Sequence, residues 1–458
     1  MPAHALRAKP RAHPLPDALA LAEKSVPRYT SYPAAPHFTA GIGPDRYADW
    51  LWRLAPCTKL SLYLHVPFCS AMCAYCGCHT KVTRRREPID DYIEGLLAEI
   101  DLVSAKTAAR RTTHLHWGGG TPSMLGPEGL ERVVEALSRR FDLGAVEEHA
   151  IELDPRSVTP ELARSLARVG VTRASFGVQD LDPEVQVAIG RVQPFEVVRR
   201  AIDLVREVGI DAINVDLMYG LPKQGIDQLV STIMLADKLR PDRVALFGYA
   251  HVPWFKAHQR LVDESALPGP AERLDQAETA REMFEGLGYV SIGLDHFARP
   301  ADPLAVAARA GTLGRNFQGY TSDDAPALIG LGASAIGKLP GGFAQNAPDI
   351  AGWRRAVGEG RLATVRGYAL TDDDRLRADV IATLMCAFEV DLGEIARRHD
   401  TTPSVFAGDV AALDGFEGVV ERHGDRIVMT PAGRPFVRLV AAAFDRHRQD
   451  AKRHSVAV

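Results

Sequence analysis

The sequence lacks long hydrophobic runs and any excess of positive charge. Its 458 residues contain no stretch of about 18 apolar residues that could span a membrane. Lys and Arg number 54 against 58 Asp and Glu, a formal net charge of −4, so no general basic field attracts nucleic acid or an anionic membrane. The N-terminus also lacks the apolar segment of a secretory signal peptide. We therefore predict a cytoplasmic protein that acts on a small molecule, without nucleic-acid or membrane partners.

Cysteine is also scarce, at six residues, yet four of the six lie close together. The segment "PFCSAMCAYCGCH" contains Cys69, Cys73, Cys76 and Cys78. Clustered cysteines in a reducing compartment seldom form disulfides, and metal binding or redox chemistry is their more common use. The pattern raises the question of which ligand needs so many thiolates on one loop.

Apolar runs that alternate with amphipathic stretches occupy residues 60 to 252. Six runs rich in β-branched and aromatic residues, among them "LSLYLHVPF" and "AINVDLMYGLP", are mostly followed by segments whose apolar residues recur every three or four positions. This alternation predicts right-handed βαβ units and a parallel sheet, either doubly wound or a barrel. The polar and glycine-rich motifs follow the strands, which favours an α/β fold with a partial (βα)6 TIM-like barrel.

The flanking regions differ from this α/β centre. We expect residues 1–55 to form an N-terminal extension that covers the active site, and residues 56–365 to form the catalytic barrel domain. Residues 270–290 suggest a further helix, and 291–346, rich in Gly, Asn and aromatics, are expected to cover the barrel mouth. Residues 366–458 combine short helices with two β-rich runs around "HGD", which resembles a small winged-helix-like domain.

A winged helix often binds DNA, but the charge of this region argues against it. Residues 366–458 contain 13 Lys and Arg against 15 Asp and Glu, a net of −2. Contact with phosphates requires a surplus of cations. We therefore predict a structural or substrate-covering role.

The spacing of Cys69, Cys73 and Cys76 favours a metal cluster with one open corner. Three thiolates on one loop can each bind a different corner of a compact iron-sulfur cluster. A structural zinc site needs two short-spaced pairs, and the cysteines outside this loop stand alone. A ferredoxin-type cluster needs four cysteines, but Cys78 lies so close to Cys76 that we favour a role other than ligand. A group of buried thiols without metal is the simpler alternative.

Around these cysteines the sequence resembles the radical S-adenosylmethionine enzymes. The shared features are the CxxxCxxC motif, the aromatic Tyr75 before its last cysteine, and "GGGTPS" (118–123) after the second predicted strand. The resemblance implies a 4Fe-4S cluster on Cys69, Cys73 and Cys76, with a fourth iron that binds S-adenosylmethionine. It also implies that Tyr75 lies beside the adenine and that the glycines approach the methionine end of the cofactor.

Segments along most of the chain resemble one family within this superfamily, the oxygen-independent coproporphyrinogen III oxidases, also called coproporphyrinogen III dehydrogenases. They include "VPRYTSYP" (26–33), "CGC", "FGVQD", "NVDLMYGLPKQ", "YAHVPWF", "GLDHFARP", "RNFQGYT" and "AQN". The resemblance implies decarboxylation of two propionates of coproporphyrinogen III to vinyl groups, giving protoporphyrinogen IX in heme biosynthesis. It implies that a 5′-deoxyadenosyl radical removes a hydrogen atom from the propionate β-carbon.

The same resemblance assigns roles to single residues. Besides the cluster on the three cysteines, it implies two molecules of S-adenosylmethionine. Their contacts are Tyr63, Tyr75, Gly119, Gly120, Thr121, Glu152, Gln179, Arg191, Asp216, Ala250 and Ile336. The residue types suit this role, because carboxylates accept hydrogen bonds from ribose hydroxyls or ammonium groups and a guanidinium pairs with a carboxylate. We assign catalytic positions to Tyr63, Arg28 and Cys78.

Several of these side chains also have ordinary structural interpretations. Glu152 would suit the cap of the next helix. Arg191 would suit a solvated helix end, whereas Asp216 in an apolar strand needs a polar partner or a polar site. His65 and His296 are as compatible with a buried structural role as with catalysis.

The implied substrate carries four carboxylates, so cations should line its pocket. Arg28 in "PRYTSYP" is the first candidate and Arg315 in "RNFQGY" the second, with ordinary surface arginines as the alternative. Radical chemistry also requires the exclusion of water, which a deep barrel mouth with covering segments provides. A small redox protein is expected as electron donor, and the chain is expected to be a monomer.

Two other functions compete with this interpretation. Heme-binding relatives without dehydrogenase activity usually lack the "PRYTSYP" segment and the extra cysteine of "CGC", and this chain has both. An electron carrier or structural iron-sulfur protein would need neither an open iron nor a barrel. Conversion of coproporphyrinogen III, as against heme binding without turnover, separates the enzyme from the heme-binding protein.

Overall fold

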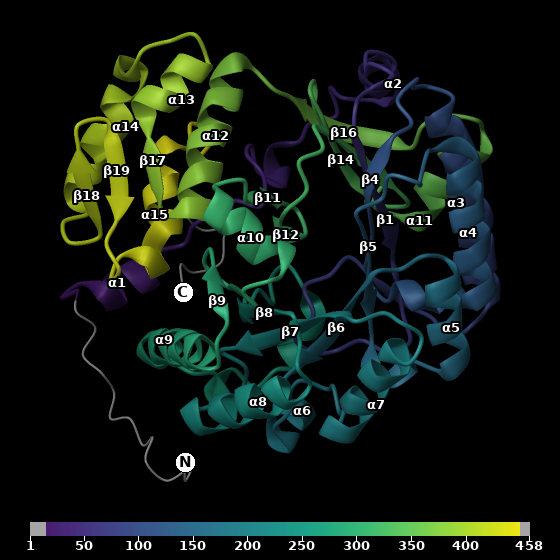
Figure 1. The fold of residues 1–458 in the computed structure, drawn as a ribbon, viewed down its shortest axis with the longest axis horizontal. Helices are drawn as coiled ribbons and strands as arrows, with labels where there is room; N and C mark the ends of the chain where they lie inside the picture. Colours follow the sequence, from purple (N-terminus) through teal and green to yellow (C-terminus); the bar gives the residue numbers. More distant parts are fainter. Residues whose placement is uncertain (1–14, 449–458) are drawn as a thin grey trace.

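Six parallel strands form the centre of the structure, a computed structural model that describes residues 15–448 (Figure 1). In spatial order they are β1 (Leu60–Val66), β4 (Thr112–Gly119), β5 (Glu148–Leu153), β6 (Arg173–Gln179), β7 (Ala212–Tyr219) and β8 (Arg243–Gly248). The helices that follow them are α3 (Glu87–Ser104), α4 (Gly126–Arg140), α5 (Pro160–Arg168), α6 (Pro183–Ala188), α7 (Phe195–Arg206), α8 (Ile226–Lys238) and α9 (Pro270–Gly286). This arrangement confirms the predicted partial (βα)6 barrel.

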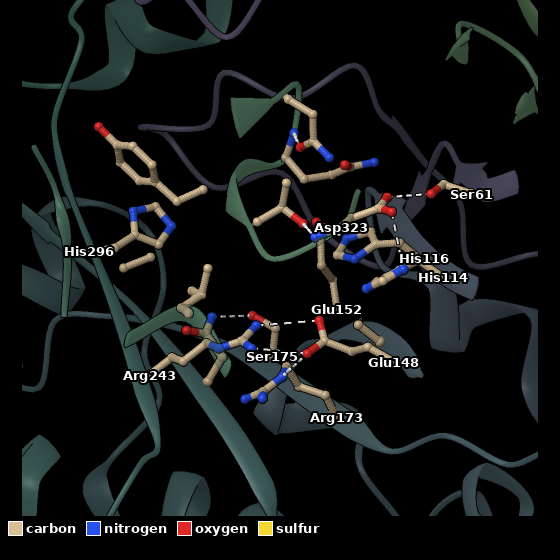
Figure 2. A pocket seen from close by; sticks show the side chains of 18 of the residues that line it. Ser61, His114, His116, Glu148, Glu152, Arg173, Ser175, Arg243, His296 and Asp323 are labelled. Carbon is tan, nitrogen blue, oxygen red and sulfur yellow. Dashed lines mark hydrogen bonds and ion pairs between the residues drawn. The ribbon is translucent and has the colours of Figure 1, made fainter. Parts of the chain in front are cut away.

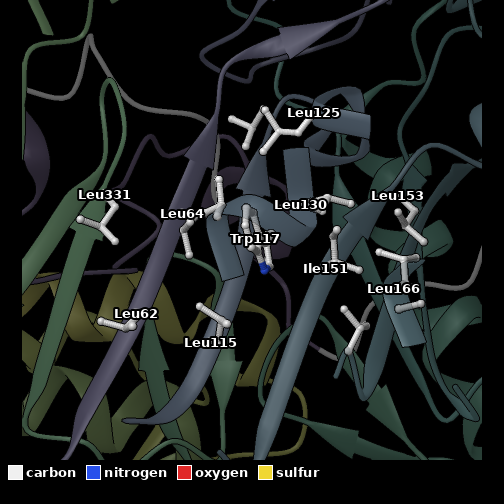
Figure 3. Close-up of a cluster of buried hydrophobic side chains, with 14 of the residues drawn as sticks. Leu62, Leu64, Leu115, Trp117, Leu125, Leu130, Ile151, Leu153, Leu166 and Leu331 are labelled. Atoms are coloured by element: carbon white, nitrogen blue, oxygen red, sulfur yellow. The ribbon is translucent and has the colours of Figure 1, made fainter. Parts of the chain in front are cut away.

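Side chains on these strands alternate between an apolar outer face and a largely polar inner face. On the outer face Leu64, Trp117 and Ile151 are buried in one core with Leu130 of α4 and Leu166 of α5 (Figure 3). Each fully buried large apolar side chain contributes roughly 1.5–3 kcal/mol, so this layer holds the helices on the sheet. Every helix found in residues 15–448 is too short or too polar to span a bilayer.

The main sheet extends beyond the six predicted strands on both sides. β13 (Ala327–Leu331) pairs parallel to β1, and further strands continue antiparallel from each side. These are β14 (Ile336–Leu339), β15 (Gly342–Asn346) and β16 (Thr364–Ala369) beyond β13, and β10 (His296–Ala298) and β9 (Val290–Ile292) beyond β8. Residues 291–346 are expected from the sequence to cover the barrel mouth, but much of this segment forms strands of the sheet. β13 pairs with β1, whose edge would otherwise have unpaired backbone groups.

The C-terminal region has a separate hydrophobic core. Its elements are α12 (Asp372–Ala387), β17 (Glu389–Asp391), α13 (Leu392–Arg398), α14 (Ala407–Ala411), β18 (Val420–His423), β19 (Arg426–Met429) and α15 (Val437–Ala441). The strands pair antiparallel in the order β17-β19-β18, and the β18–β19 hairpin turns at Gly424, whose φ is +63°. The two β-rich runs predicted around "HGD" thus form the expected hairpin.

The N-terminal segment contacts both cores. α1 (Ala18–Ala22), Tyr29 and Tyr32 belong to the core of the C-terminal region, and Tyr29 donates a hydrogen bond of 3.0 Å to Asp445. α2 (Pro44–Trp52) instead packs into the core of the barrel. Figure 1 shows α1 beside the C-terminal elements and α2 near the opposite end of the molecule. The segment therefore links the two regions.

Short elements complete the chain. They are β2 (Phe68–Cys69), β3 (Lys81–Val82), α10 (Pro303–Ala310), β11 (Gly314–Asn316), β12 (Gly319–Thr321) and α11 (Ile350–Gly358). The β11–β12 hairpin contributes residues to the cavity described below.

Candidate active site

A cavity occupies the inside of the barrel, and inner-face side chains of the strands form most of its wall (Figure 2). It encloses about 970 Å³, including the part that is open to solvent. Its polar wall residues from β1 to β8 are Ser61, His114, His116, Glu148, Glu152, Arg173, Ser175, Asn214, Asp216 and Arg243. An interior this polar indicates a binding site, because the centre of a (βα) barrel is more commonly filled with branched apolar side chains.

The floor of the cavity is an ion-pair network at the amino ends of the strands. Arg173 pairs with Glu148 at 2.8 Å and with Asp302 at 3.0 Å. Arg243 pairs with Asp302 at 2.6 Å and with Glu148 at 3.1 Å. Burial alone would raise the pKa of Glu148, but the charges of Arg243 and Arg173 lower it to about 2. Two cations and two anions balance, so this floor has a structural role.

Two carboxylates nearer the mouth lack such balance. Asp216 accepts hydrogen bonds from Asn214 at 2.8 Å and Ser175 at 3.2 Å, and burial, with the charge of Glu152, raises the pKa of Asp216 to about 6. Glu152 lies 3.4 Å from His116. No ion pair within residues 15–448 gives either carboxylate a Lys or Arg partner. The surplus negative charge suits a cationic ligand, such as a sulfonium or an ammonium group.

The cysteine loop lies after β1. Its base is closed by pairing between β2 and β3, and the Ala74 N–H donates to the Ile189 carbonyl at 3.0 Å. Each of the three motif sulfurs is within hydrogen-bonding distance of a donor: Cys69 with Thr80 at 3.2 Å, Cys73 with Arg191 at 3.5 Å, and Cys76 with the Cys78 N–H at 3.3 Å.

This donor set fits an iron-sulfur cluster. Hydrogen bonds to cysteine sulfurs are one means by which proteins stabilise cluster charge. The hydrogen bond with the Cys78 thiol lowers the pKa of Cys76 to about 6, which favours the thiolate that a metal requires. Among residues 15–448 no three Cys, His, Asp or Glu side chains converge as a single metal ion would need. The sulfurs of Cys69, Cys73 and Cys76, each beside a donor, suit separate corners of a cluster.

The glycine motif holds the cysteine loop against β4. Gly119 has φ +112°, and a Cβ there would lie 2.7 Å from the His65 ring. A Cβ on Gly120 would lie 2.5 Å from the Phe68 carbonyl oxygen, and the Thr121 N–H donates to the same oxygen at 2.7 Å. Glycine is therefore required here by close approach of the protein itself, a reason that the sequence did not indicate.

The segment after β8 contacts the outer side of the cysteine loop. Gln259 donates to the carbonyl of Tyr75 at 2.8 Å and to that of Ala250 at 3.3 Å. His258 lies 2.6 Å from the carbonyl oxygen of Cys76, and Lys256 donates to that of Cys78 at 2.9 Å. These side chains fix the backbone around the last motif cysteine.

Tyr63 and His65 face the cavity side of β1. The Tyr63 hydroxyl lies 3.0 Å from His65 Nδ1, and His65 Nε2 lies 3.1 Å from the His79 carbonyl oxygen. Burial lowers the pKa of His65, which favours the neutral ring. Both ring nitrogens have partners, so the structural interpretation of His65 is the better one. His296 differs, because it lines the cavity and lies 2.7 Å from Asp295.

Arg191 is buried and is not a solvated helix-end residue. It donates to the Gly177 carbonyl at 2.7 Å, lies 3.5 Å from Asp154, and contacts Cys73 as described above. Asp154, by contrast, caps the short helix at 155–157 through the Arg156 N–H. Arg191 thus connects the cysteine loop to the carboxyl ends of β5 and β6.

The remaining predicted contacts are spread around the strand ends. Gln179 ends β6 with φ +66°, a left-handed conformation uncommon for a residue with a side chain. Tyr75 packs against a small buried cluster that contains Val185, Ile189, Leu221 and Tyr249. Ala250 follows β8, and Ile336 begins β14. These positions are compatible with the predicted roles, which stay predictions.

The second predicted substrate arginine, Arg315 on β11, contacts the backbone of the first, Arg28 in the N-terminal segment. Arg28 is exposed and donates to the Gly248 carbonyl at the end of β8 at 3.1 Å. Arg315 donates to the carbonyls of Arg28 and Tyr29, each at 3.2 Å, and its guanidinium carbon lies 4.4 Å from the centre of the Tyr320 ring. Tyr320 lines the cavity, so this contact places Arg315 beside its wall.

Sequence reasoning missed most of the cavity wall. It did not single out the floor residues or His114, which lies 3.2 Å from Asp323. A signal was present, because polar residues share one face of successive strands: His114 and His116 are two positions apart, and Glu148 and Glu152 are four apart. This pattern marks a polar inner face.

Comparisons with known proteins agree with this arrangement. Residues 63–236 match the family model of the radical SAM superfamily. The chain is 48% identical over 446 residues to the oxygen-independent coproporphyrinogen III oxidase of Bradyrhizobium diazoefficiens, covering 96% of this chain and 99% of that protein. It is 44% identical over 442 residues to the enzyme of the same name from Paracoccus denitrificans, with coverages of 96% and 98%. The solved structure of coproporphyrinogen III oxidase from Escherichia coli, described as a radical SAM enzyme, matches with a TM-score of 0.88 and 38% identity over 92% of this chain and 98% of that one.

Proposed function

Since this chain belongs to the oxygen-independent coproporphyrinogen III oxidases of the radical SAM superfamily, we propose that its barrel converts two propionates of coproporphyrinogen III to vinyl groups. It is an oxidoreductase of porphyrin biosynthesis, and protoporphyrinogen IX is its product. Each propionate loses carbon dioxide, one hydrogen atom and one electron, which balances the change from a carboxyethyl to a vinyl group. The hydrogen atom passes to a cofactor-derived radical, and the electron passes to a one-electron acceptor.

One observation carries this proposal: three cysteine sulfurs, each with a hydrogen-bond donor, lie on the loop after β1, a strand that also lines a cavity with unbalanced carboxylates. A 4Fe-4S cluster and S-adenosylmethionine supply the one-electron and radical chemistry when bound. The chain's own residues bind and orient them. Cys69, Cys73 and Cys76 hold the cluster, and Glu152 and Asp216 accept hydrogen bonds from the cationic or hydroxyl groups of the cofactor.

The other residues assigned from the resemblance complete the cofactor sites. They are Tyr63, Tyr75, Gly119, Gly120, Thr121, Gln179, Arg191, Ala250 and Ile336, which we divide between two molecules of S-adenosylmethionine. Most of them lie at strand ends or on the loops beside them, and this position supports the assignment. Cys78 stabilises the Cys76 thiolate through its thiol and N–H. This contact gives it a positioning role in place of a ligand role.

The remaining parts of the chain shield the reaction and bind the substrate. Residues 56–365 form the proposed catalytic domain, and the N-terminal extension and residues 366–458 cover it. We propose a cytoplasmic monomer that receives electrons from a small redox protein, because free thiolates and a reduced cluster suit a reducing compartment. Arg28 is the first substrate contact that we propose, and Arg315 is the second.

Anaerobic reconstitution tests the function directly. The purified protein is loaded with iron and sulfide and incubated with a reductant, S-adenosylmethionine and coproporphyrinogen III. We expect vinyl product together with 5′-deoxyadenosine. Tight heme binding without vinyl product would favour a heme-binding relative, and a stable cluster that does not cleave S-adenosylmethionine would favour an electron carrier.

Single cysteine variants test the ligand assignment. We expect Cys73→Ser to lose the cluster absorbance and turnover together, because a serine hydroxyl is a poor cluster ligand. Cys57→Ser is the matched control, since Cys57 is exposed and lies outside the motif. Cys78→Ser should retain the cluster; if it loses the cluster and Cys73→Ser does not, the assignment is wrong.

A further inference from the structure

The cysteine loop is exposed along much of its length and is held against the segment that follows β8. Lys256 and Gln259 of that segment donate to backbone carbonyls of the loop at 2.9 and 2.8 Å. We call the exposed side chains of residues 68–86 and 250–262 the docking face. A typical protein interface takes about 20–30 residues from each partner, so one interface is large enough to include both segments.

The docking face contains cations and no carboxylates. Residues 68–86 include four Lys or Arg and residues 250–262 include two, and neither segment contains Asp or Glu, although the whole chain has a formal net charge of −4. Lys81, Arg84 and Arg260 are exposed, and none of the three has an ion-pair partner in the described part of the chain. The docking face is therefore a positive area on a slightly acidic protein.

The carboxylates that flank the docking face along the chain already have partners. At one flank Glu87 pairs with Arg85 at 2.6 Å. At the other flank Asp263 caps the short helix that follows it, and Glu264 lies 3.0 Å from His251. The cations without such a partner keep their charge available to another molecule.

Large apolar side chains are exposed on the same two segments. Trp254, Phe255 and Leu261 are 67%, 77% and 78% exposed. Met72 and Val82 are exposed on the cysteine loop. Aromatic, Met and Arg side chains are the types that protein interfaces prefer, and exposed apolar groups bordered by charge commonly mark a binding surface. The composition of the docking face is thus that of a protein interface.

The docking face is distinct from the barrel cavity but close to the motif cysteines. Neither of its segments contributes a residue to the wall described for the cavity, so a ligand in the barrel does not account for the exposed apolar groups. Residues 68–86 include Cys69, Cys73 and Cys76. Because electron transfer slows steeply with distance, a redox protein bound here has a short route to a cluster on these cysteines.

We propose that the docking face binds a small flavoprotein whose flavin edge is exposed and surrounded by acidic residues. The inference rests on the proposed function, which includes a small redox protein as electron donor, and it names the surface and the chemical class of that donor. Acidic residues complement the cations of the docking face. A flavin carrier is favoured because the apolar edge of its ring system suits exposed aromatic side chains such as Trp254 and Phe255.

The contact transfers one electron and no atoms. The anionic hydroquinone of the flavin is oxidised to the neutral semiquinone, and the cluster held by the three cysteines is reduced by the same electron. Lys81, Arg84 and Arg260 attract the acidic partner, and the exposed apolar side chains supply contact area. None of these side chains takes part in the later radical chemistry.

Binding of oxidised flavodoxin, an acidic flavin protein, tests the docking face without turnover. Anaerobic titration calorimetry on the cluster-loaded protein measures the affinity. We expect Trp254→Ala to weaken binding about 10-fold or more, as expected for an interface Trp. Arg260→Glu should weaken it about 10-fold at low ionic strength. At high salt this second difference should shrink, because salt screens exposed charges.

Arg397→Glu is the matched control for the charge reversal. Arg397 is exposed on α13 of the C-terminal region, and its substitution changes the net charge by the same amount as Arg260→Glu. Flavodoxin should bind this variant as it binds the parent protein. Lys81→Glu, on the cysteine loop, should instead behave like Arg260→Glu. Equal weakening by Arg397→Glu and Arg260→Glu would show that net charge and not the docking face governs binding, and would overturn the inference.

Dithionite, a small reductant that needs no docking surface, separates failure of the inference from failure of the function. With dithionite, Trp254→Ala and Arg260→Glu should form 5′-deoxyadenosine as fast as the parent, and with reduced flavodoxin they should form it more slowly. Unchanged flavodoxin affinity in both variants overturns the inference and leaves the proposed function intact. Absence of vinyl product from the parent with dithionite overturns the function.

Two further probes test the choice of partner. Vesicles of phosphatidylcholine and phosphatidylglycerol in equal amounts present an anionic membrane, the other surface that attracts cations and aromatic side chains. Binding of these vesicles that is lost in Trp254→Ala, without binding of flavodoxin, would overturn the inference in favour of a membrane surface. Binding of an acidic ferredoxin in place of flavodoxin would overturn the choice of a flavin carrier.

Discussion

The floor and the mouth of the barrel cavity contain the same kinds of residue but differ in charge balance. At the floor, Glu148 and Asp302 pair with Arg173 and Arg243, and the pKa of Glu148 is lowered to about 2. At the mouth, Asp216 has amide and hydroxyl partners and a pKa raised to about 6. A buried carboxylate with a guanidinium partner serves the fold, whereas one whose charge stays uncompensated is available to a cationic ligand.

The largest effect on stability should come from the floor. Asp302→Asn leaves Arg173 and Arg243 with one carboxylate fewer, and removing one member of a buried ion pair costs about 3–5 kcal/mol. Asn preserves the cap that Asp302 provides to α10 through the Leu304 N–H, so the substitution isolates the loss of charge. Urea denaturation measures the change in unfolding free energy.

Asp349→Asn is the control for this substitution. Asp349 caps α11 through the Gly352 N–H but is exposed. Asn and Asp are nearly equal as helix caps, so we expect the unfolding free energy of Asp349→Asn to be almost the same as that of the parent. An equal loss in both variants would show that the cap, and not the ion network, stabilises the floor.

At the mouth we expect the opposite result. Asp216→Asn should leave the unfolding free energy unchanged or raise it, because it removes an uncompensated buried charge. Binding of S-adenosylmethionine to the cluster-loaded protein should weaken about 10- to 100-fold, the cost of one charge-assisted hydrogen bond. Anaerobic equilibrium dialysis measures this affinity. If Asp216→Asn strongly destabilised the protein and left the affinity for S-adenosylmethionine unchanged, Asp216 would serve the fold and not the ligand.

The pH dependence of stability should also have opposite signs at the two ends. The pKa of Glu148 is lowered, so its contribution is present at neutral pH and is lost as pH falls from 4.5 to about 2. The pKa of Asp216 is raised from 3.8 to about 6, so its ionised form destabilises the protein at neutral pH and protonation removes that cost. Asp216→Asn should therefore gain more stability over the parent at about pH 7.5 than at about pH 5. A difference that does not change between these two pH values would contradict the raised pKa.

The smallest effect should come from an ion pair outside the barrel. Arg199 pairs with Glu196 at 2.5 Å and with Asp203 at 3.3 Å on the exposed face of α7. Solvent screens such pairs, so Arg199→Ala should unfold at the same urea concentration as the parent. A clear shift in the urea concentration of unfolding would show that ion pairs stabilise this protein whether or not they are buried.

The sequence predicted the parts of the site that depend on local spacing. Cys69, Cys73 and Cys76 lie on one loop, and the glycine motif follows β4, because both features are set within a few residues of chain. Alternation of apolar runs and helical periods similarly predicted the six parallel strands. The sequence missed β13 to β16, since pairing with β1 and with one another depends on edges that are distant along the chain.

Residue roles that depend on distant partners were beyond the sequence. Arg191 and Arg199 are both arginines of the same α/β segment, yet one is buried beside Cys73 and the other is exposed. Glu148 and Glu152 lie on the same strand, and only the partners contributed by β6, β8 and α10 give them different roles. Spacing along the chain contains no information about these partners.

By itself the sequence determined the barrel class, the cysteine loop and the family to which the chain belongs, because these follow from periodicity and from motifs of short range. The tertiary structure alone decided which carboxylates of the cavity are neutralised and which are not. The physical reason is that electrostatic energy depends on distance and burial in space. Glu148 and Asp302 are far apart along the chain, and folding places both of them beside Arg173.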